Sequence, residues 1–298
     1  MIIKTYGLTK YYGKVRGVED LDLEVEQGEI FGFLGPNGAG KTTTIRLLLD
    51  LIRPTKGHAE IFGLDTRRYS WQIRQRLGNV PGDDFLYEDM TGTELLDLLG
   101  RLHTGDHGAR RQELAERLEI DLGRKIKGYS TGMKQKVTLI QALMNDPELL
   151  ILDEPTSGLD PIMQQEVYDI LLEEKARGKT VFLSSHILPE VERVCDRVGI
   201  VREGHLVDLE ALPDLKRKKV RKMEVIFKEE IAPEMLTMDE VEVVSKEGRR
   251  VNLTVHGNVD KLIKRLAELE VEDVVFPEAT LEDTFMTFYS HESHEVKK

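Results

Sequence analysis

The stretch Gly35–Thr42, with the sequence GPNGAGKT, decides the fold of this chain. It follows the apolar run Ile30–Leu34 and precedes Thr42–Ile52, which has the composition of a helix. The pattern G-x-x-x-x-G-K-[ST] between a strand and a helix is typical of a phosphate-binding loop. Its glycines let consecutive backbone N–H groups surround a phosphate, and the helix that follows adds the positive end of its dipole. The sequence therefore predicts an α/β fold that binds a nucleotide.

Two side chains of this loop have distinct expected roles. Lys41 is expected to reach the β- and γ-phosphates, and the Thr42 hydroxyl is expected to coordinate Mg²⁺. The residues expected to contact the nucleotide here are Gly35, Pro36, Asn37, Gly38, Ala39, Gly40, Lys41, Thr42 and Thr43. The loop alone predicts a nucleotide triphosphatase and does not distinguish kinases, GTPases and motor ATPases.

A second apolar run, Leu149–Leu152, ends in the adjacent carboxylates Asp153 and Glu154. We expect Asp153 to hold Mg²⁺, directly or through water, and Glu154 to orient and deprotonate the attacking water. An isolated Asp-Glu pair is more often a solvated turn, since acidic residues are common on surfaces. Its position at a strand end, in a chain with a phosphate loop, favours the catalytic interpretation.

Composition limits the remaining possibilities. The chain has 298 residues, of which 40% are hydrophobic and 32% charged, as in a globular protein with one main domain and an appendage. No stretch approaches the roughly 20 apolar residues of a transmembrane helix, so we expect a cytoplasmic chain. A net charge of −12 argues against a nucleic-acid partner. The basic run Lys216–Lys222 is the exception, and a solvated hinge or a contact for anionic lipid headgroups is favoured there.

Three features together resemble the ATP-binding-cassette (ABC) transporter family: the phosphate loop, the segment LDEPTSGLDP (Leu152–Pro161), and His186 in LSSHIL. The resemblance implies that the segment Ser157–Asp160 crosses a dimer interface, with Asp160 among the nucleotide-binding residues. It also implies that His186 contacts the γ-phosphate. His186 follows the predicted strand Thr180–Leu183, where open α/β sheets place ligand-binding residues.

The segment YSTGMKQ, Tyr129–Gln135, looks like the signature segment of that family. There, a serine and a glycine, here Ser130 and Gly132, bind the γ-phosphate held by the opposite subunit. A helix N-terminus next to a glycine is a physically reasonable anion site. Met133 stands where the commonest signature has glutamine, a variant that the resemblance associates with exporters of the ABC-2 type for drugs, lipids or ions.

A second departure from the family pattern is NVPGDD, Asn79–Asp84. The family usually has a glutamine after the proline, which reaches the metal and senses the membrane partner, whereas this chain has Gly82. Three alternatives remain open: Asp83 or Asp84 supplies the metal ligand, the loop communicates through its backbone, or PGDD is simply a turn.

Tyr12 stands directly before Gly13, where the family places the aromatic ring that stacks on adenine. Tyr11 and Tyr12 would point to opposite faces of a strand, so only one can stack, and Tyr12 is favoured. Stacking tolerates different bases, so the preference for ATP comes from the resemblance.

The predicted fold is a P-loop NTPase (RecA-like) α/β core with a helical insert, followed by a small α+β domain. We place the ABC-type ATP-binding domain at residues 1–212, its helical subdomain at about 85–145, and the accessory domain at 213–298. The resemblance covers about residues 2–210.

The predicted function is that of an ATPase subunit of an ABC transporter, with ATP and Mg²⁺ as cofactors. It would act as a homodimer, or as a heterodimer with a second ATP-binding subunit, and energise translocation, in the direction of export, by a separate transmembrane permease. The chain would then lie on the inner face of the cell membrane. The alternative is a soluble ABC-type ATPase acting on the ribosome or DNA through the basic run.

Overall fold

The computed structural model describes residues 1–82, 86–103, 107–213, 220–232, 235–236, 238, 241–256 and 259–276. It divides the chain into two compact units, Met1–Glu210 and Ala211–Lys298. The boundary lies two residues before the one predicted after residue 212. Each unit has a hydrophobic core of its own. Among the described residues, no helix is both long enough and apolar enough to cross a bilayer.

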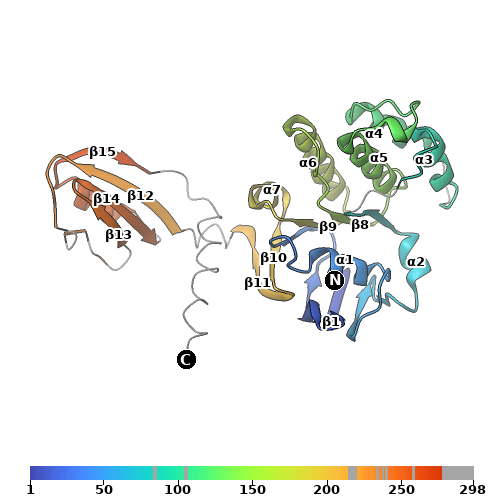
Figure 1. The fold of residues 1–298 in the computed structure, drawn as a ribbon, viewed down its shortest axis with the longest axis horizontal. Helices are drawn as coiled ribbons and strands as arrows, with labels where there is room; N and C mark the ends of the chain where they lie inside the picture. The colour runs from blue at the N-terminus through green and yellow to red at the C-terminus, as the bar shows by residue number, and fades with distance from the viewer. Residues whose placement is uncertain are drawn as a thin grey trace. The chain divides into compact units, whose positions relative to one another are not determined.

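A six-stranded sheet forms the centre of the first unit (Figure 1). The strand order is β11-β10-β4-β9-β8-β7, and the neighbouring pairs from β10 to β7 are parallel. The strands are β4 (Ile30–Leu34), β7 (Leu77–Val80), β8 (Leu149–Asp153), β9 (Thr180–Ser185), β10 (Arg197–Arg202) and β11 (His205–Ala211). Every residue of β4, β8 and β9 is buried, as expected for parallel strands covered on both faces. The three predicted strands are therefore present, and two of them extend slightly further than predicted.

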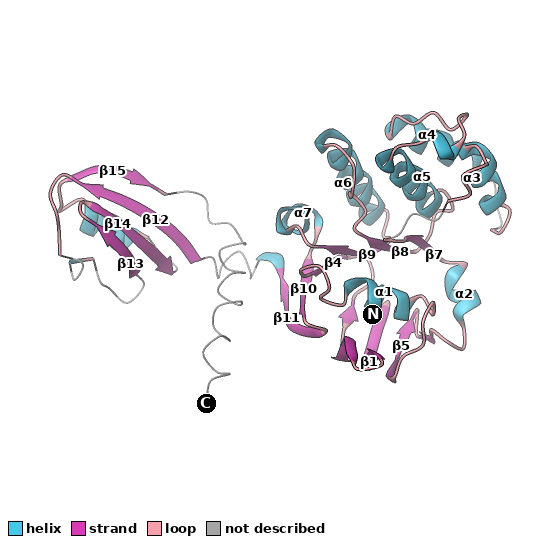
Figure 2. Cartoon of the chain, viewed as in Figure 1, coloured by secondary structure: helices cyan, strands magenta, loops and turns pink. Residues whose placement is uncertain are grey.

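Helices cover both faces of this sheet (Figure 2). The helices of the core are α1 (Lys41–Leu48), α2 (Ser70–Arg74), α6 (Pro161–Ala176) and α7 (Leu188–Val194). Both α6 and α7 contact β9 on one face, and α1 contacts β8 on the other. The prediction that the first helix reaches Ile52 is wrong, because Asp50 has a φ of 55°, which a right-handed helix cannot continue.

An antiparallel sheet lies beyond α1 and was not predicted as a separate element. Its strand order is β2-β1-β5-β6, with β3 paired to β1. The strands are β1 (Ile3–Tyr12), β2 (Val15–Leu21), β3 (Glu24–Val25), β5 (Lys56–Ile61) and β6 (Leu64–Asp65). One hydrophobic cluster joins this sheet, α1 and the six-stranded sheet, with members such as Ile3, Ile45 and Phe182. The phosphate loop is thus supported by a single continuous core.

The helical insert contains α3 (Gly92–Gly100), α4 (Gly108–Arg117), a short 3-10 helix (Ile126–Gly128) and α5 (Thr131–Leu143). The helix α3 begins with a capping box, in which the Thr91 hydroxyl accepts from the Glu94 N–H and the Glu94 carboxylate accepts from the Thr91 N–H. The helix α5 packs against β7, α3 and α4 and so connects the insert to the core sheet.

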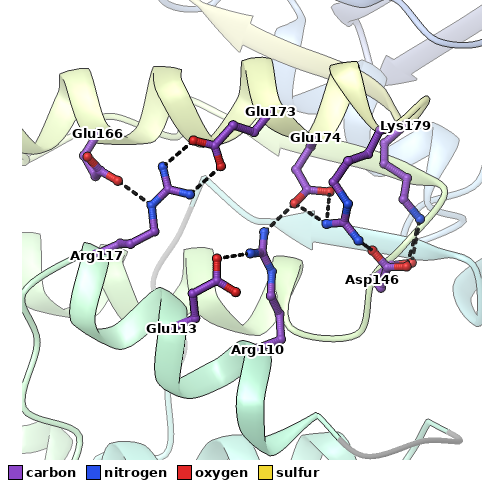
Figure 3. A network of polar contacts seen from close by, with 9 residues as sticks. Arg110, Glu113, Arg117, Asp146, Glu166, Glu173, Glu174 and Lys179 are labelled. Carbon is purple, nitrogen blue, oxygen red and sulfur yellow. Dashed lines mark hydrogen bonds and ion pairs between the residues drawn. The ribbon is translucent and has the colours of Figure 1, made fainter.

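Ion pairs join α4 of the insert to α6 of the core (Figure 3). The Arg117 guanidinium contacts Glu173 with Nη1–Oε2 and Nη2–Oε1 distances of 2.5 and 2.9 Å, and its Nε lies 2.5 Å from Glu166 Oε1. The hydrogen bond from Arg117 holds the pKa of Glu173 below its usual range. Because Glu173 is 53% exposed, water screens much of this pairing.

The second half of the network is buried at its centre. Glu174 is 2% exposed, and its Oε1 accepts from Arg110 Nη2 at 2.5 Å and from Arg177 Nη1 at 2.9 Å. Arg177 and Lys179 both contact the Asp146 carboxylate, at 2.6 and 3.1 Å. A buried carboxylate is stable only when it is paired and hydrogen-bonded, so Arg110 is the more consequential partner across the two helices.

The described residues of the second unit form a four-stranded antiparallel sheet and the helix α9. The strand order is β13-β14-β12-β15. Its elements are β12 (Val220–Phe227), β13 (Val241–Glu247), β14 (Arg250–His256), α9 (Asp260–Leu266) and β15 (Val271–Val275). Leu262 and Leu266 of α9 pack with Val225, Phe227 and Leu253 of the sheet. The end of the predicted basic run begins β12, and residues 216–219 of that run lie outside the described residues.

A pair of substitutions tests the unequal contributions of the two arginines. Arg110→Met removes a charged partner from buried Glu174 and is expected to lower the free energy of unfolding by about 1.5–3 kcal/mol. Arg117→Met leaves exposed Glu173 to water and is expected to cost less than about 1 kcal/mol. Urea unfolding measures both variants. Equal losses would contradict the assignment of the buried centre to Glu174.

Candidate nucleotide-binding site

The phosphate loop joins β4 to α1, and its lysine is buried within it. Lys41 is 5% exposed, and its Nζ donates to the carbonyl oxygens of Gly35 and Pro36 at 2.8 and 3.1 Å. The same ammonium lies 3.5 Å from Glu154 Oε1. The loop backbone and the Glu154 carboxylate therefore contact the same ammonium group.

Gly40 is a position in the loop where only glycine fits. Its φ is 109°, outside the range of ordinary L side chains, and a Cβ there would lie 2.5 Å from the carbonyl oxygen of Gly17 in β2. The carbonyl of Gly40 accepts the Thr44 N–H at 2.9 Å, which starts the hydrogen bonding of α1. Close packing against β2 thus fixes the position at which α1 begins. The positive end of the helix dipole lies at the same position.

Asp153 ends β8 beside the loop and has one oxygen without a partner. It is 2% exposed, its Oδ1 accepts from Ser184 Oγ at 2.5 Å, and its Oδ2 has no hydrogen-bond partner among the described residues. Asp153 and Thr42 line the same cavity of about 170 Å³. A buried carboxylate oxygen needs a proton donor or a cation, and a carboxylate with a hydroxyl is a donor set that suits Mg²⁺. These residues fit the metal predicted for them.

Glu154 lies between the lysine and the histidine. Its Oε1 is 3.5 Å from Lys41 Nζ and 3.1 Å from His186 Nδ1. The residue has a φ of 49°, an uncommon left-handed conformation outside glycine. The Glu154 carboxylate is 29% exposed and the His186 ring 43%, so both are accessible to water and to a ligand. The structure therefore brings together the three residues predicted to be catalytic.

The signature segment forms the N-terminus of α5. The Ser130 hydroxyl caps the helix by accepting the Met133 N–H at 3.2 Å, which leaves its proton available to donate. A Cβ on Gly132 would lie 2.6 Å from the carbonyl oxygen of Gly158, so the signature packs closely on the loop after Glu154. Gln135, buried in α5, donates to the Pro155 carbonyl at 2.8 Å and so contacts the same loop closer to Glu154.

Asp160 is placed as the N-cap of α6. Its Oδ1 accepts from the N–H groups of Ile162 and Met163, both at 3.0 Å. Pro161 follows at the first helical position, as is common in helices. Capping of α6 therefore explains an aspartate at position 160 without a ligand, and the side chain is also exposed.

The two neighbouring tyrosines of β1 have different environments. Tyr11 donates its hydroxyl to Glu19 Oε1 at 2.6 Å, whereas the Tyr12 ring is 46% exposed. A Cβ built on Gly17 would meet both the Tyr12 ring at 2.9 Å and Thr43 of the phosphate loop at 3.0 Å. Tyr12 thus lies next to the loop with an accessible face, as a ring that stacks on a base requires.

Two buried polar groups next to the site were not predicted. Glu190 of α7 accepts from Thr156 Oγ1 and Ser185 Oγ, both at 2.6 Å, and from Tyr168 at 3.0 Å. Burial and the Glu190 carboxylate raise the pKa of Tyr168. Ser184 is the other group. The sequence does indicate Ser184 and Ser185, because two polar residues end the buried and mainly apolar strand TVFLSS.

The PGDD loop is described only in part. Gly82 lies against the Asp153 carboxylate, since a Cβ there would be 2.6 Å from Asp153 Oδ2. Asp83, the possible metal ligand, and Asp84 lie outside the described residues.

A parallel sheet with the phosphate loop after β4 and the acidic pair after β8 defines a P-loop nucleotide triphosphatase. The family model described as ABC transporter matches residues 18–157. The chain is 38% identical over 297 residues to the bacitracin transport ATP-binding protein BcrA of Bacillus licheniformis, covering 96% of each chain. The protein belongs to the family of ABC transporter ATP-binding subunits.

Two further comparisons agree with this membership. The fluoroquinolones export ATP-binding protein of Mycobacterium tuberculosis is 38% identical over 230 residues, which cover 74% of this chain and 75% of that protein. The dimeric structure of a bacterial ABC transporter cassette has a TM-score of 0.65 at 25% identity, covering 71% of this chain and 99% of that one.

The predicted fold class and family are confirmed by these findings. The protein is an ATP-binding and ATP-hydrolysing subunit of an ABC transporter, which energises translocation by a separate transmembrane subunit. The relatives support this function and not the alternative of a ribosome- or DNA-directed ATPase. ABC ATP-binding subunits work as dimers with a transmembrane component.

Substitution of Gly40 tests the close packing of the loop. Gly40→Ala combines a positive φ with a clash against backbone. We expect the free energy of unfolding to fall by about 1–3 kcal/mol more than the unfavourable φ alone would cause. Gly28→Ala is the matched control, because Gly28 has a φ of 82° and no atom within 4 Å of the added Cβ. Its expected cost is about 1–2 kcal/mol. Chemical unfolding of both variants gives the difference, and equal costs would contradict the packing argument.

Proposed function

We propose that Lys41, Thr42 and Asp153 bind the triphosphate and its Mg²⁺, and that Glu154 and His186 act on the water and the γ-phosphate. The observation that carries this proposal is the unpartnered Asp153 Oδ2 beside the Lys41–Glu154–His186 cluster. Mg²⁺, when bound, neutralises charge on the β- and γ-phosphates. Lys41 adds a fixed positive charge on the same side, which stabilises the charge that develops there during transfer.

Glu154 is proposed as the general base. Its carboxylate is partly open to water, and the 3.1 Å contact between Glu154 Oε1 and His186 Nδ1 orients it. A carboxylate in this position accepts a proton from the attacking water as the bond to the γ-phosphate forms. In the imidazolium form both ring nitrogens of His186 carry a proton, so Nε2 would donate to a γ-phosphate oxygen while Nδ1 faces the Glu154 carboxylate. Tyr12 is proposed to stack on the adenine ring from the opposite end of the loop.

The second half of the nucleotide site is proposed to come from another subunit. Ser130 and Gly132 would contact the γ-phosphate held by the Lys41 loop of the partner, with Asp160 at the same interface. The free hydroxyl proton of Ser130 and the start of α5 provide donors for an anion. The contact of Gly132 with Gly158 couples the signature to the loop that follows Glu154. Whether the partner is a second copy or a different cassette, the same surfaces are used.

A cleft between the insert and the core is the proposed docking site for the transmembrane permease. A cavity of about 330 Å³ is lined mainly by apolar side chains, including Leu51, Leu99 and Leu102. Leu51 and Leu102 are 58% and 61% exposed and line the same cavity, and exposed apolar side chains that gather in one place are typical of an interaction site. The cavity shares Leu49, Leu51 and Asn79 with the smaller cavity that ends on Thr42 and Asp153. A segment docked here would therefore lie next to the metal side of the nucleotide site.

Export is the proposed direction of transport, and the inner face of the cell membrane is the proposed location. The export relative in Mycobacterium tuberculosis and the methionine at signature position 133 support this direction. The second unit is proposed as an accessory domain of the same subunit, since the alignment with the bacitracin transport protein extends over 297 residues and so includes it.

Substitution of the proposed base tests the catalytic assignment. Glu154→Gln keeps the size of the side chain but cannot accept the proton, so we expect ATP binding, a closed dimer and turnover reduced by about 100-fold or more. ATPase assays and size-exclusion chromatography with ATP provide the measurements. Glu203→Gln is the control, because Glu203 also has a φ of 49° but lies in an exposed turn. Near-normal turnover by Glu154→Gln would remove Glu154 from its role.

A charge placed in the cleft tests the docking site. Leu102→Glu would place a carboxylate against the apolar surface of a docked segment, so we expect at least tenfold less multi-span membrane protein to co-purify with the tagged subunit. Leu172→Glu is the matched control, because Leu172 lies on α6 and is also exposed, at 39%. Melting temperatures show whether both variants are folded. Equal recovery of the membrane protein with Leu102→Glu and wild type would place the docking site elsewhere.

A further inference from the structure

Ser184 is a fully buried hydroxyl in the core of the sheet. It lies near the end of β9, where it pairs with Asp153 of β8. The four residues before it in the strand, TVFL, are all buried. Its exposed fraction is 0%. A hydroxyl in such a place destabilises the fold unless it is hydrogen-bonded, so its partners indicate why it is present.

The Ser184 hydroxyl uses both its donor and an acceptor site on the pair Asp153–Glu154. Ser184 Oγ donates to Asp153 Oδ1 at 2.5 Å and accepts from the backbone N–H of Glu154 at 3.2 Å. A hydroxyl has one proton, and an ionised carboxylate can only accept, so the direction of both bonds is fixed. One side chain thus contacts the metal-side carboxylate and the residue that carries the general base.

The bond to Oδ1 determines which oxygen of Asp153 is left for a cation. With Oδ1 occupied, Oδ2 is the oxygen without a partner among the described groups, and it faces Gly82, where a missing side chain leaves room. Rotation of the carboxylate would break a short, charge-assisted bond in a buried place. Ser184 therefore keeps the orientation of the carboxylate fixed.

The bond from the Glu154 N–H supports a strained backbone. At a φ of 49° a non-glycine residue is less stable than in the right-handed region. Such a conformation persists where the surroundings hold it. The Glu154 N–H lies 3.3 Å from the Ser184 carbonyl and 3.2 Å from its hydroxyl, and this conformation accompanies the approach of the carboxylate to His186.

We propose that Ser184 is a positioning residue for ATP hydrolysis, whose single hydroxyl fixes the metal-facing oxygen of Asp153 and the backbone of Glu154 together. This inference rests on the proposed roles of Asp153 and Glu154. The neighbouring Ser185 provides the contrast. Successive strand residues point to opposite faces, and Ser185 donates to Glu190 Oε2 at 2.6 Å, away from the acidic pair.

The test measures metal binding separately from turnover. Mn²⁺ binding is followed by electron paramagnetic resonance in the presence of a non-hydrolysable ATP analogue, for wild type, Ser184→Ala, Ser184→Cys and Ser185→Ala. We expect the Mn²⁺ dissociation constant to rise about 10- to 100-fold in Ser184→Ala, the range of a lost hydrogen bond to a charged group. Ser184→Cys keeps the volume with a weaker donor, so a smaller rise is expected. Ser185→Ala is expected to stay within about twofold of wild type.

Turnover provides the second readout. In Ser184→Ala we expect kcat to fall at least tenfold, with metal-free binding of the ATP analogue within about threefold of wild type. Wild-type Mn²⁺ affinity and kcat in both Ser184 variants would overturn the inference, as would equal effects of Ser184→Ala and Ser185→Ala. The outcome is separable from the proposed function. An inactive Glu154→Gln together with a wild-type Ser184→Ala refutes only the role of Ser184, whereas an active Glu154→Gln refutes the proposed base.

Discussion

The parallel pairing of β9 with β4 on one side and β8 on the other is the constraint on which the site depends. Its register places Leu34 beside Ser185 and Asp153 beside Ser184, so the phosphate loop, the acidic pair and His186 all begin at the same level of the sheet. The Phe182 ring of β9 packs against two rings of β4, with centroid distances of 5.8 Å to Phe31 and 5.5 Å to Phe33. Such aromatic pairs contribute about 0.5–1.5 kcal/mol beyond their burial, so the same packing that stabilises the core also fixes the register.

Much of this site could be predicted because its signals are local. The loop Gly35–Thr42 lies within one strand-turn-helix unit, and the pair Asp153–Glu154 directly follows an apolar run. In a parallel sheet the strand ends meet at one edge, so segments that each predict a strand end also predict a shared site. The closeness of Lys41, Glu154 and His186 follows from that rule, without any knowledge of the side-chain distances.

The parts that could not be predicted depend on pairing between distant segments. The bond from Ser184 to Asp153 joins residues 31 positions apart, and its existence requires the β8–β9 register. The antiparallel sheet was missed for the same reason, because its β1 pairs with β5, as Ile3 does with Ile61, far away in the sequence. Its strands β3 and β6 have only two residues each, too short for a periodic signal. The left-handed backbone of Glu154 is likewise imposed by its surroundings, since the residue type alone disfavours it.

The contact between Gly82 and Asp153 links the possible substitutions at these two positions. A Cβ at position 82 would lie 2.6 Å from Asp153 Oδ2, so the glutamine more usual in the family requires either the carboxylate or the backbone at position 82 to shift. A single substitution at position 82 would therefore also change the surroundings of the Asp153 oxygen proposed to face the metal. An evolutionary path from this loop to the glutamine form must change the Asp153 side chain, or the backbone at position 82, together with the loop residue.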